Sequence, residues 1–409
     1  MYREVLQNRN YRKLLAANAV NRLGDGVDSI AFTWLAYTAT ESASISALVF
    51  AANILPTALF QPLVAPVVDK WKKKSVMMWA DWLRGLLLAG FIGLLLQNRL
   101  TPWMFVAFTF FINTVEAFRI PAGVAYLPKF LEGDQLDRGI NLNQITDQAF
   151  TLAGTAAGGV LAAFSPALAM GIDLASFLLS GLFIAGMKVD EVVDEAVRES
   201  GYWTNLKGGF QYLRKNRAFG IFVTVALLSN MLACVFSALA AAYVSGVLHE
   251  PPTYLSAAEM ILTVCGLVMV WLYPKLSGHF RPSILLTWFM FGVSGLLYLG
   301  LAFLPGLTGT GRTAAWALLF VVMGLSSGLT GAFLNIMFVK VVEQAYLARA
   351  AGVFNSAVTL SMPVMSFLLA AVVPITGIPV LLGAAGVLSL AVLAVFRLRG
   401  NCKILDAMV

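Results

Sequence analysis

Long apolar runs recur along the whole chain and limit its possible folds more than any other feature. Of the 409 residues, 59% are hydrophobic and only 12% are charged, whereas about 25% are charged in soluble domains. One membrane-spanning helix needs about 20 predominantly apolar residues. Runs of this kind cover residues 11–39, 44–68, 75–97, 101–127, 140–163, 167–187, 218–247, 254–274, 282–304, 313–339, 350–373 and 377–396. The sequence therefore predicts an all-α membrane protein with twelve transmembrane helices.

Lysine and arginine are unevenly distributed between the loops, and this predicts the orientation of the chain. They gather in both terminal tails and in alternate loops, whereas the opposite loops contain only Arg99 and Arg312. Because loops rich in Lys and Arg stay in the cytoplasm, both termini are predicted to be cytoplasmic in a multi-pass protein of the cell membrane. Membrane topology then explains the net charge of +7, and no nucleic-acid partner is predicted.

The longest polar stretch, residues 188–217, divides the chain into halves of six predicted helices each. Four of its apolar residues recur at helical spacing: Trp203, Leu206, Phe210 and Leu213. This spacing predicts an amphipathic helix, either on the cytoplasmic membrane surface or as a packing strut between the halves. The halves form a weak internal repeat. We therefore expect two pseudo-symmetric six-helix bundles, at 1–187 and 218–409, joined by the linker at 188–217.

The first predicted helix contains three charged residues, Arg22, Asp25 and Asp28, between Asn18 and Trp34. A charge at the centre of a bilayer costs at least about 2.5–3.5 kcal/mol. The polar residues of this stretch recur three and four positions apart, so they form a stripe on one helix face that should meet protein or water. A titratable carboxylate in a transport pathway is one explanation. A structural ion pair between Arg22 and Asp25 is the other.

Intramembrane charge is concentrated in the first half of the chain. It comprises Arg22, Asp25, Asp28, Asp81, Arg84, Glu116, Arg119, Asp147 and Asp173. In the second half only Glu259 lies well inside an apolar run. We therefore predict that the N-half couples transport to an ion, and that the C-half provides shape and apolar contacts for the substrate. A low-dielectric cavity favours the protonated form of a carboxylate, which releases its proton when exposed or paired. We predict Asp25 or Asp28 as the proton site, with Glu116 as the alternative.

Polar and aromatic residues near mid-helix are candidates for the wall of a substrate cavity. They are Asn21, Arg22, Phe32, Trp34, Tyr37, Arg119, Asp147, Phe236, Tyr243 and Asn335. The aromatic members can equally anchor a helix at the membrane interface. Arg119 can form a local ion pair with Glu116, three residues earlier, or reach Asp25 or Asp147 on a neighbouring helix.

Several short motifs in the N-half together carry a family resemblance. They are Gly24-Asp25, Thr40-Glu41-Ser42, Pro56, Asp69-Lys70, Asp81-Trp82-Leu83-Arg84, Arg119-Ile120-Pro121, Leu127-Pro128, Asn141 and Ile172-Asp173-Leu174-Ala175-Ser176-Phe177. As a set they resemble the major facilitator superfamily, and within it the drug-exporting branch that includes macrolide efflux proteins and the enterobactin exporter. The resemblance implies two bundles that alternate between inward-open and outward-open states around a central cavity, usually driven by protons. The chain departs from the family's loop motif at Ala65, where the family has glycine, and at Lys70, where it has arginine.

A charged group near the cytoplasmic ends of the second and third predicted helices is expected to act as a gate. It comprises Asp69, Lys70, Asp81 and Arg84. An aspartate at this place can accept hydrogen bonds from a facing helix N-terminus and pair with arginine while the cytoplasmic side is closed. A solvated basic loop is the alternative explanation for Lys70.

The combined features predict a secondary active transporter rather than an enzyme. Residues 324–328 match the nucleophile motif G-x-S-x-G but lie in an apolar run. The sequence has only two histidines, which argues against a catalytic triad and a histidine-rich metal site. It has no P-loop, which argues against ATP hydrolysis. We predict a proton-coupled antiporter for multidrug efflux of amphipathic or lipophilic molecules by alternating access. A transporter of lysophospholipid or another lipid and a non-transporting membrane sensor are the alternatives. The expected partners are substrate, protons and membrane lipid, without a cofactor, and the chain is expected to be a monomer.

Overall fold

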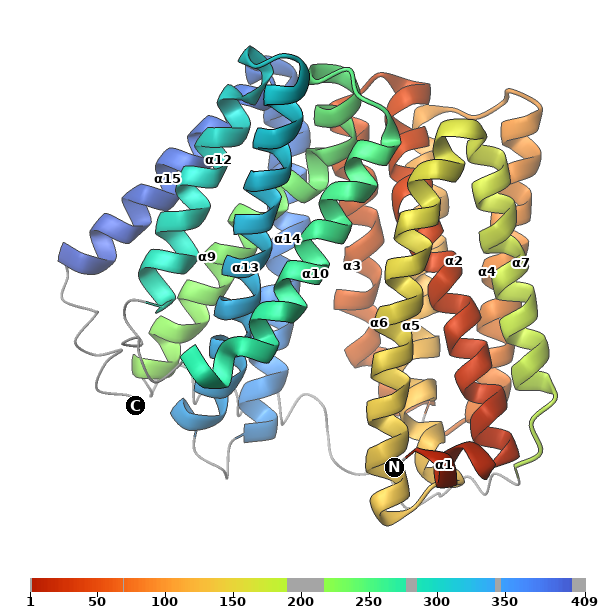
Figure 1. The fold of residues 1–409 in the computed structure, drawn as a ribbon. Coiled ribbons are helices and arrows are strands. Elements are labelled where there is room, and N and C mark those ends of the chain that lie inside the picture. The colour runs from red at the N-terminus through yellow and green to blue at the C-terminus, as the bar shows by residue number, and fades with distance from the viewer. Residues whose placement is uncertain (1, 69, 190–216, 277–284, 343–346, 399–409) are drawn as a thin grey trace. The chain divides into compact units, whose positions relative to one another are not determined.

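The computed structural model describes residues 2–68, 70–189, 217–276, 285–342 and 347–398, and every regular element in these ranges is a helix (Figure 1). The chain divides into two compact units, residues 1–202 with 250–256 and residues 203–249 with 257–409. The four apolar residues of the predicted linker helix lie outside the described residues.

The described part of the first unit is built from six long helices and two short ones. They are α1 (Arg3–Gln7), α2 (Arg9–Thr40), α3 (Ala43–Val68), α4 (Lys73–Leu96), α5 (Pro102–Tyr126), η1 (Leu127–Lys129), α6 (Gly133–Phe164) and α7 (Pro166–Ala185). The Asn8 side chain accepts hydrogen bonds from the backbone N–H groups of Asn10 and Tyr11 at the start of α2. Ser165 accepts one from the N–H of Leu168 at the start of α7. These caps satisfy donors that have no partner within their own helix.

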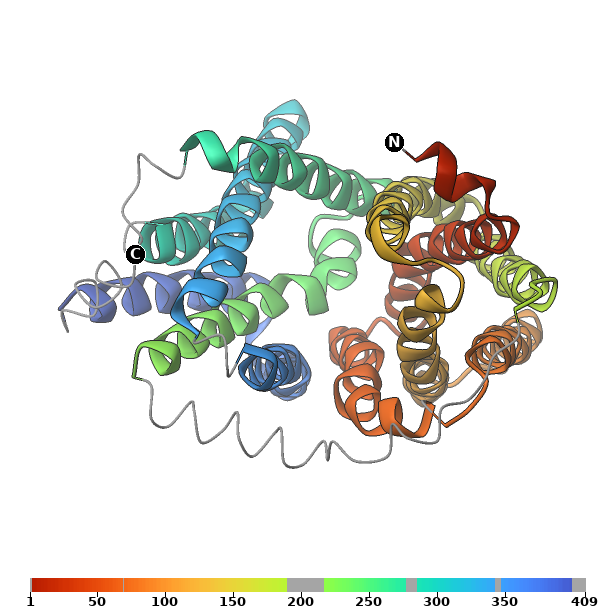
Figure 2. The same cartoon turned by 90° about the horizontal axis from the view of Figure 1, so that it is seen from below.

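Helix α2 has the most extensive packing in the first unit. It lies against α6 and α7, while α4 lies against α5 and α7, and α3 lies against α5 (Figure 2). The backbones of α2 and α6 approach so closely that a Cβ on Gly154 would overlap the carbonyl oxygen of Leu23, and a Cβ on Gly26 would overlap that of Thr151. Only glycine fits at both positions. The predicted polar stripe lies on another face of α2 and meets protein there, since Asn21 and Asp25 contact Asp81 and Arg84 of α4.

Polarity distinguishes α2 and α6 from the other long helices. Ten helical segments in the described residues are long and apolar enough to cross a membrane by length and composition, and neither α2 nor α6 is among them. These two helices pack on each other through glycines, whereas Asn141, Gln144 and Gln148 of α6 are exposed. Together with the ten apolar segments, α2 and α6 give the twelve spans that the sequence predicts, which confirms the all-α membrane fold.

The second unit contains the other six long helical segments. They are α9 (Arg217–Ala242), which continues into the π-helical turn η2 (Tyr243–Val247), α10 (Pro252–Leu276), the π-helix η4 (Leu285–Val293) with α12 (Ser294–Phe303) and η5 (Leu304–Gly306), α13 (Gly309–Val341), α14 (Leu347–Thr376) and α15 (Ile378–Leu398). The first residues of α10, up to Ser256, group with the first unit. Within the second unit α9 packs against α14, and α12 packs against α15.

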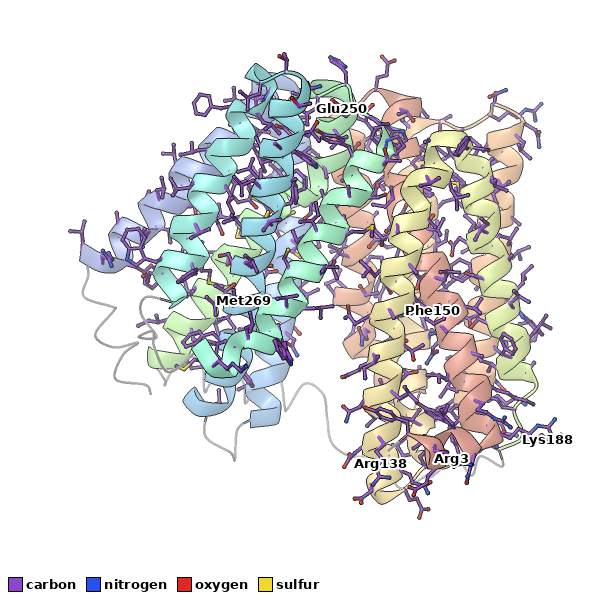
Figure 3. All side chains as sticks on the ribbon, viewed as in Figure 1. Arg3, Arg138, Phe150, Lys188, Glu250 and Met269 are labelled. Atoms are coloured by element: carbon purple, nitrogen blue, oxygen red, sulfur yellow. The ribbon has the colours of Figure 1, made fainter. Side chains whose placement is uncertain are left out.

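Three basic residues that lie far apart in the sequence of the first unit meet at one end of its helices. Arg3, Arg138 and Lys188 lie at the same end, whereas Phe150 lies about midway along α6 (Figure 3). Phe150 is exposed, and so are the polar side chains of Gln144 and Gln148 on the same helix. The basic residues of distant segments are therefore brought to the same end of the unit.

Candidate functional site

Four charged side chains of α2, α4 and α5 form a closed ring of alternating sign, which we call the charged ring. Arg22 Nη1 lies 3.0 Å from Asp25 Oδ2 and 3.7 Å from Glu116 Oε1. Arg84 Nη2 lies 2.9 Å from Asp25 Oδ1 and 3.4 Å from Glu116 Oε2. Each carboxylate thus meets one arginine with each of its oxygens, and the ring as a whole is neutral.

Burial within the charged ring is graded from one arginine to the other. The side chain of Arg84 is 4% exposed, those of Asp25 and Glu116 are 19% and 14% exposed, and that of Arg22 is 31% exposed. The Arg84 guanidinium also lies 4.1 Å from the centre of the Phe177 ring on α7, in a cation–π contact. Because a buried charge without a partner is costly, the ring ties α2, α4 and α5 together.

A second ion pair lies deeper in the first unit and joins α4 to α5. Arg119 Nε donates to Asp81 Oδ1 at 2.5 Å, and Ser180 Oγ on α7 donates to Asp81 Oδ2 at 2.6 Å. Arg119 Nη2 also donates to Asn18 Oδ1 on α2 at 3.3 Å, and Asn21 Nδ2 lies 3.5 Å from Asp81 Oδ1. Asp81 is completely buried, so this network supplies the partners that its charge requires.

Three intramembrane acids of the first unit have no arginine or lysine within ion-pair distance among the described residues. These unpaired acids are Asp28 on α2, Asp147 on α6 and Asp173 on α7. Asp173 accepts a hydrogen bond from Ser176 Oγ at 3.2 Å. The Oδ1 atoms of Asp28 and Asp147 are buried and have no hydrogen-bond partner in the described part of the chain. The first unit therefore contains three more intramembrane acids than intramembrane arginines.

Asp28 and Asp173 belong to the surroundings of Arg84. They lie within electrostatic range of each other, of Asp25 and of Arg84. The Nε and Nη1 atoms of Arg84 are buried and have no hydrogen-bond acceptor among the residues that the structure describes. Arg84 thus retains donors beyond those used in the charged ring, close to two acids without a cation.

Two of the predicted gate residues, Asp81 and Arg84, belong to different ion-pair networks. Asp81 and Arg84 do not pair with each other, because Asp81 pairs with Arg119 and Arg84 pairs with Asp25 and Glu116. Lys70 is exposed, and Asp69 lies outside the described residues. The local pair between Glu116 and Arg119 is likewise replaced by contacts between helices. Only the local pair of Arg22 with Asp25 forms as the spacing suggests.

Most of the aromatic cavity candidates are packed inside the units. Phe32 is buried, with its ring centre 5.0 Å from that of Phe91. Phe236 and Tyr243 are buried in an aromatic cluster with Trp316, where the Tyr243 hydroxyl donates to the Leu301 carbonyl at 2.5 Å. Of the remaining candidates, Trp34 is buried and Tyr37 is partly buried, while the side chain of Asn335 is outside the described part.

Ser180 and Asp173 are the polar residues near the ion pairs that the sequence does not single out as site residues. Ser180 lies on an apolar helix and gives no periodic signal of its own. Asp173 is visible as an intramembrane acid, but only the structure shows that it shares the neighbourhood of Asp28 and Arg84.

Known proteins match the chain over most of its length. A sequence profile of the Major Facilitator Superfamily matches residues 14–366. Macrolide efflux protein A of Streptococcus pyogenes is 21% identical over 354 residues, which is 85% of each chain. Multidrug efflux pump Tap of Mycobacterium bovis is 26% identical over 358 residues, or 84% of this chain and 82% of Tap. The crystal structure of the nucleoside transporter NupG superposes with a TM-score of 0.76 at 14% identity, covering 95% of this chain and 98% of NupG, and this likeness concerns the fold alone.

Proposed function

The chain belongs to the major facilitator superfamily, and we propose that it is a proton-coupled antiporter that exports amphipathic or lipophilic small molecules by alternating access. The surplus of intramembrane acids in the first unit carries the proposal. Three intramembrane arginines are paired with Asp25, Glu116 and Asp81, so none is left for the three unpaired acids. An isolated ionised carboxylate in a low-dielectric interior is unstable and takes up a proton.

Asp28 is the proton carrier in this proposal. It lies on the same helix as Asp25, it has no ion-pair partner in the described part of the chain, and it is within electrostatic range of Arg84. Asp25 and Glu116, the other predicted proton sites, hold the arginines of the charged ring instead. When Asp28 releases its proton, the spare donors of Arg84 provide the nearest positive charge.

The substrate class is supported by the relatives and by the composition of the second unit. Two relatives that align over most of their length are named as a macrolide efflux protein and a multidrug efflux pump. The described part of the second unit has an aromatic and aliphatic interior with Glu259 as its only acid well inside a span. We accordingly assign proton coupling to a bundle at 1–187, and the shape and apolar contacts that recognise the substrate to a bundle at 218–409. The proposal also includes cytoplasmic termini and a monomer in the cell membrane.

Reconstituted protein tests the proposal directly. Purified protein in liposomes is supplied with an imposed pH gradient and with a macrolide, a lipophilic cationic dye or a lysophospholipid, while a trapped pH dye reports proton movement. We expect a macrolide or the dye to cause proton movement in the wild type. If lysophospholipid is the only compound that causes proton movement, the chain is a lipid transporter. If compounds bind and none of them causes proton movement, the proposed proton coupling is wrong.

The variant Asp28→Asn isolates the proton site. It keeps the size of the side chain and removes the titratable group, so we expect normal folding, retained binding of substrate and loss of gradient-driven transport. Asp134→Asn is the matched control, because Asp134 is exposed in the first turn of α6. Gradient-driven transport by Asp28→Asn at the rate of the control would remove Asp28 from the mechanism.

A further inference from the structure

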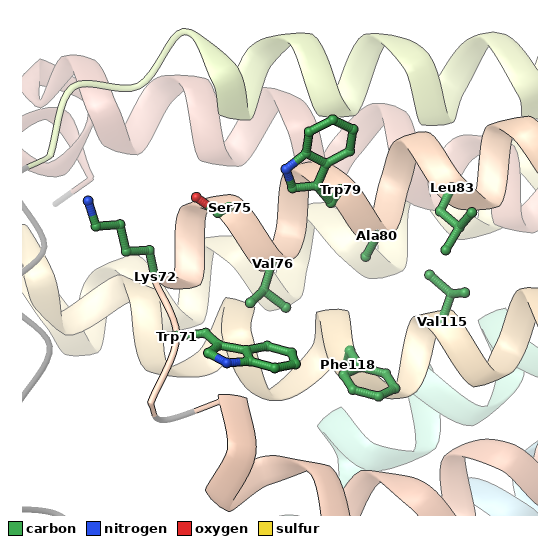
Figure 4. A pocket seen from close by; sticks show the side chains of 9 residues that line it. All are labelled: Trp71, Lys72, Ser75, Val76, Trp79, Ala80, Leu83, Val115 and Phe118. Atoms are coloured by element: carbon green, nitrogen blue, oxygen red, sulfur yellow. The ribbon is translucent and has the colours of Figure 1, made fainter. Parts of the chain in front are cut away.

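A groove of about 400 Å³ lies between α4 and α5 on the first unit, and no residue of the charged ring lines it. Its wall is almost entirely apolar and includes Val76, Ala80 and Leu83 from α4 with Val115 and Phe118 from α5 (Figure 4). A hydrophobic groove of this size is suited to a hydrocarbon chain rather than to a polar solute.

The groove is open toward the surroundings of the unit. Trp79 and Leu83, which both line it, are 62% and 45% exposed. At one end the ring of Trp71 stacks on Phe118, with ring centres 6.5 Å apart and planes 9° apart. Tryptophan is enriched where the hydrocarbon core of a membrane meets the headgroups. The position of Trp71 therefore marks the headgroup end of the groove.

The length of the groove matches one leaflet of a bilayer. It extends along α4 from Lys72 to Leu83, a rise of about 16 Å at about 1.5 Å per residue. The hydrocarbon core of a bilayer is about 30 Å thick, so one leaflet contributes about 15 Å. An acyl chain that enters at the Trp71 end would thus reach the bilayer midplane near Leu83.

Positive charge is available at the same end. Lys72 lines the groove, is exposed and has no acceptor for its ammonium group among the described residues (Figure 4). The two following lysines are engaged otherwise, because Lys73 is buried and Lys74 donates to the Met187 carbonyl at 2.7 Å. Lys72 is therefore the groove residue that can neutralise a phosphate.

We propose that this groove binds an anionic phospholipid of the cytoplasmic leaflet, with an acyl chain along α4 and the phosphate at Lys72. The leaflet follows from the basic loop of residues 70–74, which the positive-inside rule assigns to the cytoplasm. The proposal concerns a lipid that stays bound at the outer face of the first unit, and it does not depend on which molecule is transported.

Fluorescence quenching by brominated lipids tests the site in the intact protein. The protein is placed in phosphatidylcholine nanodiscs that contain a minor fraction of brominated phosphatidylglycerol, or the same fraction of brominated phosphatidylcholine. The sequence has 9 tryptophans, and two of them, Trp71 and Trp79, line the groove. The fluorescence quenching that the wild type shows and the double variant Trp71→Phe/Trp79→Phe lacks is therefore the quenching in the groove. We expect this quenching at a lower mole fraction of brominated phosphatidylglycerol than of brominated phosphatidylcholine.

Two substitutions separate the headgroup contact from the groove itself. Lys72→Gln should lower the preference for phosphatidylglycerol about fivefold, the usual effect of one basic residue at an anionic membrane surface. Lys129→Gln is the matched control, since Lys129 is also exposed but does not line the groove. Val76→Phe places a ring inside the groove and should remove the quenching with both lipids while Lys72 remains.

Three results would overturn the proposal. Equal quenching by the two brominated lipids would show ordinary lipid contact without a site for the anionic headgroup. An effect of Lys129→Gln as large as that of Lys72→Gln would assign the preference to general surface charge. Protection of the groove tryptophans from both lipids, together with the mass of a dimer per nanodisc, would assign the groove to a second copy of the chain.

Discussion

The charged ring predicts an unusually large loss of stability when Arg84 is replaced by glutamine. Arg84 is the most buried member of the ring, and its Nη2 lies 2.9 Å from Asp25 and 3.4 Å from Glu116. At 2.9 Å and an effective dielectric constant of about 20, the attraction between two unit charges is about 6 kcal/mol. Desolvation offsets much of this attraction, but removing one partner leaves the others buried and uncompensated, and the net cost of such a change is about 3–5 kcal/mol.

The same substitution at an exposed ion pair is the matched control. Arg138 pairs with Glu4 at 2.8 Å, but their side chains are 34% and 65% exposed. A surface pair of this kind contributes about 0–1 kcal/mol. Unfolding of both variants in a titration of mixed micelles with a denaturing detergent, followed by tryptophan fluorescence, gives the two losses under the same conditions.

A second substitution decides whether charge or packing causes the loss. Arg84→Gln leaves one cation, Arg22, for Asp25 and Glu116, so adding Glu116→Gln restores a neutral group. We expect the double variant to be more stable than Arg84→Gln alone, which is a coupling that independent sites do not show. A loss for Arg84→Gln no larger than that of Arg138→Gln, or a double variant with additive losses, would refute the reasoning.

Two further substitutions test the packing of α2 and the network around Asp81. Gly154→Ala should destabilise the protein by about 1–3 kcal/mol, because the added Cβ would overlap the Leu23 carbonyl oxygen. A Cβ at Gly171 meets no atom within 4 Å, so Gly171→Ala should be neutral or slightly stabilising. Equal melting temperatures of the two variants would show that α2 and α6 separate without cost. Ser180→Ala removes the 2.6 Å hydrogen bond to Asp81 and should lower the free energy of unfolding by about 1.5–3 kcal/mol. Ser29→Ala removes only a hydrogen bond to the Gly26 carbonyl within its own helix, so it should change stability in detergent little. A loss at Ser29 equal to that at Ser180 would contradict the role given to Asp81.

The positions of the long helices follow from the sequence because hydropathy determines which segments can enter a membrane. The observed start of α6 shows the limit of this signal. The apolar run begins near residue 140, whereas α6 begins at Gly133. The additional turns are polar, and a contact from another helix supports them, since the Tyr11 hydroxyl donates to the Gly139 carbonyl at 2.9 Å. Hydropathy cannot reveal a helix extension that depends on a tertiary contact.

The pairing of the intramembrane charges could be predicted only in part. Spacing along one helix suggests Arg22 with Asp25 and Glu116 with Arg119, and among the described residues the structure forms only the first of these pairs. A long arginine side chain reaches a neighbouring helix as easily as its own next turn, so the choice depends on how the helices pack. The aromatic residues present the same difficulty, because helical spacing does not distinguish Phe32 in a packed core from a residue in a cavity.

The arrangement around Arg84 explains how a proton at Asp28 would move helices rather than only neutralise a charge. Arg84 lies on α4 and holds Asp25 of α2 and Glu116 of α5. An ionised Asp28 would compete for the same guanidinium, whereas a protonated Asp28 would leave the charged ring intact. Proton binding would thereby change how firmly α4 is held to α2 and α5. A transporter requires such a link, because a proton that binds equally well to two conformations cannot shift the equilibrium between them.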